Sequence, residues 1–184
     1  FEPPPRSMDA LFFAIRPDEE AKTHTTQLVQ RLRNEHHLAA EPIPEQRLHV
    51  TLHAFDDPVG WWEKDVTLAA EAAALVAMPP FEVAFDRVLS FSPLADKHPL
   101  VLSGSAGVVE LISFWHVLGI SMARVGLKRF VKAGFTPHMT LLCDSHLVAQ
   151  QAIKPIVWTT REFVLVRSLV GKGEHVVLGR WPLL

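Results

Sequence analysis

One four-residue pattern, His-x-Thr-Leu, occurs twice in this chain, at residues 49–52 and at residues 138–141. The two copies begin 89 positions apart, and each lies in a segment whose apolar and polar residues alternate, as in a half-buried β-strand. A third His-x-Thr begins at His24, but glutamine follows it and the surrounding periodicity is helical. The repeat therefore predicts a fold of two similar halves, each with one strand that carries this pattern.

The other apolar patterns predict strands and helices that alternate along the chain. We expect helices over residues 18–36, 61–78 and 106–125, and strands over residues 11–15, 47–54, 81–91, 99–103, 137–143, 156–169 and 175–181. Asp144 and Ser145 can cap a further short helix. Because no shift in composition marks a boundary, we expect residues 8–184 to form one α+β domain.

Composition narrows the class of protein. The 184 residues are 48% apolar, enough for a substantial core, and their net charge of -2 argues against bulk electrostatic binding of duplex DNA or anionic lipid. Cys143 is the only cysteine, which excludes an internal disulfide and a thiolate zinc cluster and favours the reducing cytoplasm. Polar residues interrupt the apolar stretch 99–125, so we expect no membrane span. Residues 1–7, with three consecutive prolines, are expected to form an extended tail without a secretory signal, and Met8 is a plausible start.

The side chains of the repeated pattern carry the predicted chemistry. Alternation places His49 and Thr51 on one face of their strand, with His53 further along that face at a cleft rim or the surface, and it pairs His138 with Thr140 in the other half. Two imidazoles can serve as general acid and general base near neutral pH, and threonine hydroxyls can donate to phosphate oxygens. The four groups therefore predict a pocket for an anionic phosphoryl group, with one imidazole on either side of the phosphorus. The sequence offers no plausible set of metal ligands.

A basic cluster precedes the second motif. It consists of Arg124, Lys128, Arg129 and Lys132, and Phe135 follows it. These cations could steer the phosphates of an RNA end, although cations are also favoured at the end of the helix that precedes them. Phe135 could equally stack on a base or pack in the core.

The chain resembles the 2H phosphoesterases, and within them the 2'-5' RNA ligase-like RNA 2',3'-cyclic phosphodiesterases. The two His-x-Thr-Leu motifs carry the resemblance. Residues 11–18 look like the family's opening strand and turn, residues 135–138 like its lead into the second motif, and residues 162–168 and 181–183 like its closing strands. The resemblance covers nearly everything from Met8 onward. It implies a two-lobed, pseudo-two-fold arrangement of antiparallel sheets, flanked by helices, around a central cleft.

The same resemblance implies an activity. It implies metal-independent opening of a 2',3'-cyclic phosphate to a 2'-phosphate without a cofactor, with His49 protonating the leaving 3' oxygen and His138 activating water. The chain departs from the family in the segment 53–57 after the first motif and at His175, where a tyrosine is common. Since this chain contains no tyrosine, any stacking on a substrate base must come from phenylalanine, tryptophan or histidine.

Several functions are compatible with these residues. The expected substrate is an RNA end or a small cyclic nucleotide, with no membrane and no obligatory protein partner. A 2'-5' RNA ligase, or a hydrolase of another cyclic phosphate such as ADP-ribose 1'',2''-cyclic phosphate, would use the same acid, base and phosphate donors. A non-catalytic protein that binds RNA ends through the same histidines is the alternative from another class.

Overall fold

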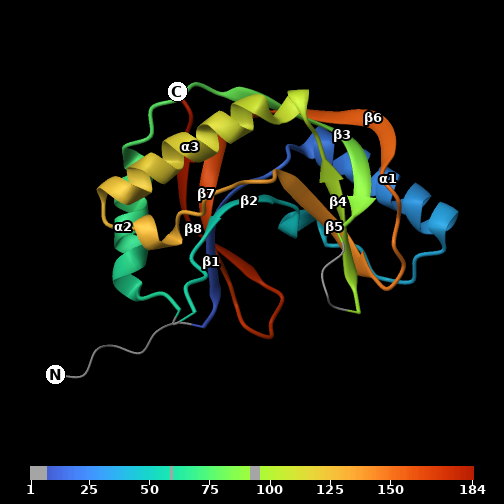
Figure 1. The fold of residues 1–184 in the computed structure, drawn as a ribbon, viewed down its shortest axis with the longest axis horizontal. Coiled ribbons are helices and arrows are strands. Elements are labelled where there is room, and N and C mark those ends of the chain that lie inside the picture. Colours follow the sequence, from blue (N-terminus) through green and yellow to red (C-terminus); the bar gives the residue numbers. More distant parts are fainter. Residues whose placement is uncertain (1–7, 59, 92–95) are drawn as a thin grey trace.

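The structure, a computed structural model, describes residues 8–58, 60–91 and 96–184, and the predicted tail of residues 1–7 lies outside them. Within these residues, two four-stranded antiparallel sheets build two lobes (Figure 1). The first sheet has the order β2-β1-β7-β8 and consists of Ala10–Ile15 (β1), Val50–Ala54 (β2), Glu162–Ser168 (β7) and His175–Pro182 (β8). The second has the order β5-β4-β3-β6 and consists of Phe81–Ser90 (β3), His98–Ser103 (β4), His138–Asp144 (β5) and Gln151–Thr160 (β6). The expected two-lobed α+β architecture is confirmed.

Helices lie against both lobes (Figure 1). They are Glu19–His36 (α1), Glu63–Ala74 (α2) and Val109–Arg124 (α3), with short 3-10 turns at Glu45–Arg47 (η1), Ala106–Val108 (η2) and Lys128–Phe130 (η3). Helix α1 follows β1 of the first sheet but packs against β6 of the second. Helix α3 follows β4 of the second sheet but contacts β2 of the first, where Trp115 Nε1 donates to Leu52 O at 2.9 Å. Each half of the chain thus completes the core of the other lobe.

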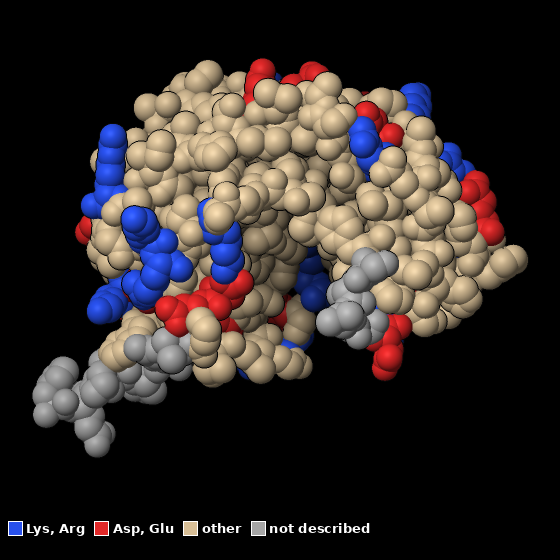
Figure 2. Space-filling view, viewed as in Figure 1, with Lys and Arg blue, Asp and Glu red and all other residues tan. Residues whose placement is uncertain are grey.

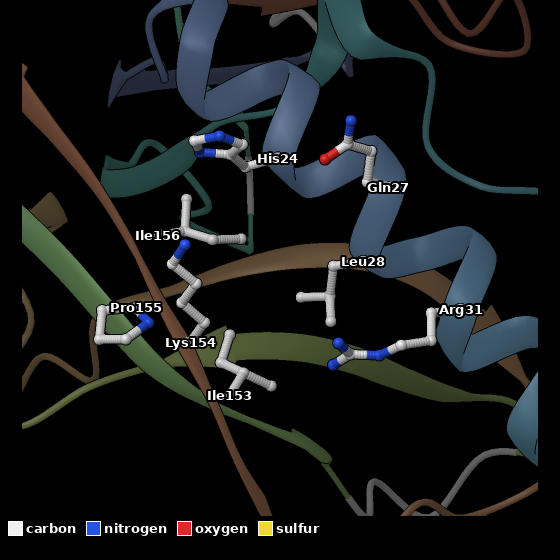
Figure 3. Close-up of a pocket in the computed structure, with 8 residues that line it drawn as sticks. All are labelled: His24, Gln27, Leu28, Arg31, Ile153, Lys154, Pro155 and Ile156. Atoms are coloured by element: carbon white, nitrogen blue, oxygen red, sulfur yellow. The ribbon is translucent and has the colours of Figure 1, made fainter.

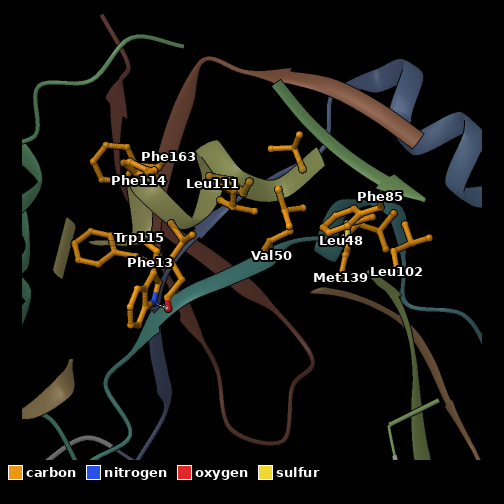
Figure 4. Close-up of a cluster of buried hydrophobic side chains, with 14 of the residues drawn as sticks. Phe13, Leu48, Val50, Phe85, Leu102, Leu111, Phe114, Trp115, Met139 and Phe163 are labelled. Atoms are coloured by element: carbon orange, nitrogen blue, oxygen red, sulfur yellow. Dashed lines mark hydrogen bonds between the residues drawn. The ribbon is translucent and has the colours of Figure 1, made fainter. Parts of the chain in front are cut away.

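One continuous apolar core runs through both lobes (Figure 4). It joins Phe13 of β1 and Met139 of β5 through Phe114 of α3, whose ring lies 5.5 Å from that of Phe81 and 5.0 Å from that of Phe163. The close packing of these rings fixes the two sheets relative to one another.

The apolar helix expected over residues 106–125 is η2 followed by α3. By length and composition, residues 106–124 are the one candidate for a membrane span in the described part of the chain. In the structure Leu111, Phe114, Leu118 and Met122 of this helix are fully buried in the core between the sheets. Packing inside the protein therefore accounts for its apolar face.

Both motifs contain a β-bulge at the same position. In β2, Thr51 and His53 pair with consecutive residues of β1, so Leu52 between them has no partner. In β5 the same irregularity follows Thr140 and leaves Leu141 without a partner. A bulge reverses the alternation of faces, so the polar face of each motif strand ends at its threonine.

The bulge explains why His53 does not lie where alternation predicts. His53 is fully buried, its Nε2 lies 2.9 Å from Trp115 O, and its ring stacks on that of Trp115 at 4.9 Å. The expectation that it shares the face of His49 is wrong, because the extra residue turns it into the core.

The end of the chain differs most from the prediction. The single strand expected over residues 156–169 is two strands of different sheets, β6 and β7, separated at Arg161. As the edge strand of its sheet, β6 tolerates Pro155, which obscured its start in the sequence. No helix follows Asp144, where the chain bends instead, and α2 ends at Ala74 rather than at residue 78.

Asp144 fastens the end of β5 to the segment that follows α1. Its Oδ1 accepts from the backbone N–H groups of Ala39 and Ala40 at 3.1 and 2.9 Å, and its Oδ2 accepts from that of His146 at 2.9 Å. Hydrogen bonds from the backbone of His146 and Ala40 lower the pKa of this carboxyl to about 2.

We expect Asp144→Ala to lower the free energy of unfolding by about 2–3 kcal/mol at pH 7, because it removes hydrogen bonds to a buried charged group. Since folding lowers the pKa, the carboxylate stabilises the fold fully above pH 3.8, and this stabilisation disappears as the pH falls through about 2. Urea unfolding at pH 7, 4 and 2.5 measures both effects, with Asp96→Ala at an exposed position as the control. Equal unfolding midpoints for Asp144→Ala and the wild type would contradict this account.

Candidate active site

The two motif strands lie at the edges of their sheets and contact each other. His49 immediately precedes β2, and His138 is the first residue of β5. A backbone hydrogen bond of 2.8 Å from Ile43 N to Leu141 O joins the segment before β2 to β5. The surface is hollowed between the two lobes (Figure 2). The fold therefore brings residues 89 positions apart in sequence to one junction.

Both motif imidazoles make the same hydrogen bond to the backbone. Nδ1 of His49 lies 2.6 Å from Arg47 O, and Nδ1 of His138 lies 2.8 Å from Thr136 O, in each case the carbonyl two residues earlier. Because a carbonyl oxygen can only accept, Nδ1 carries the proton in both rings. In the neutral imidazole Nε2 is then the basic nitrogen, and Nε2 of His49 lies 3.1 Å from Thr51 Oγ1.

The surroundings of His49 disfavour its charged form. Its pKa is lowered, first by burial and then by the positive charges of His138 and Arg47, while the hydrogen bond to Arg47 O acts in the opposite direction. The two motif histidines are therefore close enough for the charge on one to oppose a charge on the other.

Aromatic rings surround both histidines. Phe12 stacks on His49 at 4.9 Å between ring centroids, and His175 meets His49 edge-on at 5.3 Å. On the other side Phe91 meets His138 edge-on at 4.9 Å. The two phenylalanines thus help to fix the orientation of the imidazole rings, since aromatic contacts of this kind have preferred geometries.

His175 is a third imidazole at the site, which the sequence analysis did not assign. Burial, followed by the positive charges of His49 and Arg47, lowers its pKa to about 4, so it is neutral at pH 7. Its position results from the β7–β8 register, which pairs it with Ser168. Phe12 was missed because it lies in an entirely apolar strand, where no alternation tells which of two adjacent phenylalanines faces the site.

The threonines occupy equivalent positions. Thr51 and Thr140 are half-buried and pair across their sheets with Ala14 of β1 and Val101 of β4, just before the bulges. Because the bulge comes after each threonine, both hydroxyls lie on the same face of their strand as the motif histidine.

Two members of the basic cluster form ion pairs with acidic side chains. Arg129 forms ion pairs with Asp65 at 2.9 Å and with Asp57 at 3.6 Å, and Lys132 pairs with Asp56. Phe135 stacks on the Trp115 ring at 5.2 Å and packs against the core. Arg124 and Lys128 are exposed at the end of α3 and in η3. The contact of these five residues with RNA stays a prediction.

The structure also shows where His24 lies. It lines a groove of about 400 Å³ between α1 and β6, together with Arg31 and Lys154 (Figure 3). Thr26, the threonine of this third His-x-Thr, donates its hydroxyl to Glu45 Oε1 at 2.8 Å. Among the described residues, no group of three His, Cys, Asp or Glu side chains is arranged to hold a metal ion.

Comparison with known families identifies the class of protein. The sequence model of the 2'-5' RNA ligase superfamily matches residues 17–172. The chain belongs to this superfamily, which confirms the resemblance to the 2H phosphoesterases. A search of curated proteins found no match.

Solved structures share the fold over nearly the whole chain. A crystal structure of a phosphoesterase has a TM-score of 0.74 at 22% identity, with 95% of this chain and 98% of that chain covered. For E. coli LigT in apo form the TM-score is 0.71 at 23% identity, with 95% and 97% covered. For TT0787 of Thermus thermophilus it is 0.73 at 21% identity, with 95% and 97% covered. E. coli LigT also has crystal structures complexed with 3'-AMP and with phosphate.

We expect His138→Ala to raise the pKa of His49, because the change removes a positive charge and opens a buried site. Titration of the imidazole nitrogens by ¹⁵N NMR measures this pKa. His24→Ala, in the groove between α1 and β6, serves as the control and leaves the pKa of His49 unchanged. A His49 pKa that stays constant or falls in His138→Ala would show that the two rings do not interact.

Proposed function

We propose that the protein is a phosphodiesterase that opens 2',3'-cyclic phosphates at RNA ends or in cyclic nucleotides. The observation that carries this proposal is the pair of imidazoles whose Nδ1 atoms are bound to backbone carbonyls. This leaves two Nε2 atoms, from opposite lobes, as the groups that exchange protons with a substrate. Crystal structures of E. coli LigT complexed with phosphate and with 3'-AMP are consistent with a phosphate-binding site in this fold.

The proposed reaction is an in-line displacement at phosphorus. His138 Nε2 takes a proton from water as the water oxygen attacks, and the bond from phosphorus to the 3' oxygen breaks. His49 Nε2 gives its proton to that oxygen, so the products are a 2'-phosphate and a 3'-hydroxyl. The hydroxyls of Thr51 and Thr140 donate to the non-bridging oxygens and stabilise their charge in the transition state.

The lowered pKa of His49 in the free protein does not suit a proton donor, so the proposed reaction requires that substrate binding raise this pKa. In the free protein burial keeps the ring neutral, whereas a proton donor must start protonated. The negative charge of a bound cyclic phosphate favours the imidazolium and raises the pKa again. Substrate binding and proton uptake by His49 are therefore coupled.

The further assignments follow from this activity. We propose that residues 8–184 act as one 2H phosphoesterase domain in the cytoplasm, with no cofactor and with the basic cluster near the path of longer RNA. A 2'-5' RNA ligase would use the same groups with a 5'-hydroxyl in place of the attacking water, so that ring opening forms a 2'-5' diester. A hydrolase of ADP-ribose 1'',2''-cyclic phosphate would use the same groups and differ in the side chains around them. Turnover distinguishes all of these from a protein that only binds RNA ends.

We expect His49→Ala and His138→Ala each to lower kcat on 2',3'-cyclic nucleotides by a factor on the order of 10² to 10⁴, because each removes one partner in proton transfer. The double variant should be little worse than either single one, since the two rings act as a unit. His24→Ala changes the third His-x-Thr of the chain and should keep full activity. Near wild-type turnover in either motif variant would refute the acid–base pair.

The product identifies which histidine gives the proton. We expect a cyclic-ended oligonucleotide to yield the 2'-phosphate, which chromatography separates from the 3'-phosphate standard. The side chains around the two histidines differ, since Phe12 and His175 contact His49 whereas Phe91 contacts His138. We expect this asymmetry to hold the ribose in one orientation. A 3'-phosphate product would exchange the roles of the two histidines.

A further inference from the structure

Arg47 has two connections to the site, through its carbonyl and through its side chain. The carbonyl accepts from His49 Nδ1, and the guanidinium reaches the β7–β8 turn, where its Nη1 lies 3.5 Å from the point that a Cβ on Gly173 would occupy. The residue is half-buried. Within residues 8–58, 60–91 and 96–184, no carboxylate forms an ion pair with this guanidinium.

Hydrogen bonds hold the segment that contains Arg47 and the turn that its guanidinium reaches. Its backbone N–H donates to Pro44 O at 2.9 Å in η1, and its carbonyl is held by the histidine. Across from it, the β7–β8 turn is fastened by Asp9, whose Oδ1 accepts from Val170 N at 2.9 Å. Gly173 in this turn has a φ of +62°, a conformation that glycine adopts without strain. The guanidinium therefore lies between two segments that are each held by hydrogen bonds.

The charge around Arg47 is positive. Its guanidinium lowers the pKa of both His49 and His175, and no acidic group contributes to either shift. A half-buried guanidinium loses part of its hydration, and an opposite charge compensates that loss. An anion beside the two imidazoles would supply that compensation, and guanidinium binds phosphate in a bidentate manner.

We propose that Arg47 and His175 form a subsite for a second phosphate of the substrate, the 5'-phosphate of the nucleotide that carries the cyclic phosphate. This rests on the proposed function. If His49 protonates the leaving 3' oxygen, the 3' side of the ribose faces His49. The 3' oxygen is bonded to C3' of the ribose, and the 5'-phosphate is attached through C5' to the neighbouring ring carbon, C4'. The 5'-phosphate therefore extends past His49 toward Arg47. His175, edge-on to His49, contributes a neutral ring that can donate one hydrogen bond.

The subsite would distinguish three substrates. Adenosine 2',3'-cyclic phosphate lacks the second phosphate, its 5'-phosphorylated form carries it as a monoester, and the dinucleotide ApA with a 2',3'-cyclic end carries it as a diester. We expect the wild type to have the higher kcat/KM on the last two. A preference for the monoester form alone indicates a nucleotide substrate, and an equal preference indicates an RNA end; both support the subsite.

Arg47→Gln tests the inference. We expect kcat/KM on the two substrates with a 5'-phosphate to fall about 10- to 100-fold more than on adenosine 2',3'-cyclic phosphate, as for the loss of charged hydrogen bonds. Arg47→Lys keeps the charge and should lose less. Arg31→Gln, in the groove between α1 and β6, is the matched control and leaves the ratios unchanged. An equal fall on all three substrates, or no fall, would overturn the subsite while the hydrolytic function stands.

A binding measurement separates this inference from the proposed function. Calorimetry with adenosine 3',5'-bisphosphate and with 3'-AMP requires no turnover. We expect the wild type to bind the bisphosphate more tightly and Arg47→Gln to bind both alike. A bisphosphate preference in a protein that hydrolyses none of the three cyclic substrates would retain the subsite and reject the hydrolase. Equal affinities in the wild type would reject the subsite.

Discussion

The hydrogen bond from each motif imidazole to the carbonyl two residues earlier is the interaction on which the site depends. It is formed at 2.6 Å by His49 and at 2.8 Å by His138, and it makes Nε2 the reactive nitrogen of both rings. Because donor and acceptor lie on the same short segment, the bond survives only while the chain before each strand keeps its conformation. The η1 turn before β2 provides that support on one side.

The rest of the fold brings the two segments together. Each motif strand is at the edge of its sheet, each has a bulge directly after its threonine, and each half of the chain contributes a helix to the other lobe. The bulge has a clear consequence for packing: it allows Leu52 and His53, or Leu141 and Leu142, to be buried in succession. The polar face is thereby confined to one imidazole and one hydroxyl per strand.

Part of this arrangement could be predicted from sequence. The duplicated motif, the bounds of α1 and the two-lobed fold follow from patterns that are local or shared with a family. The inward turn of His53 could not be predicted, because a bulge depends on the partner strand rather than on the strand itself. His175 could not be assigned for a similar reason, since only the β7–β8 register brings it to His49. The ion pairs of Arg129 with acids far away in the sequence were equally hidden.

The central claim concerns the tautomers of two rings, and NMR measures them directly. Long-range ¹H–¹⁵N spectra of the ¹⁵N-labelled protein, recorded at a pH at which both motif rings are neutral, distinguish a protonated Nδ1 from a protonated Nε2. The account predicts that His49 and His138 are both protonated at Nδ1, unlike the Nε2–H form that is commoner in free histidine. A protonated Nε2 in either neutral ring would contradict the account, because Nε2 of that ring could not then accept a proton.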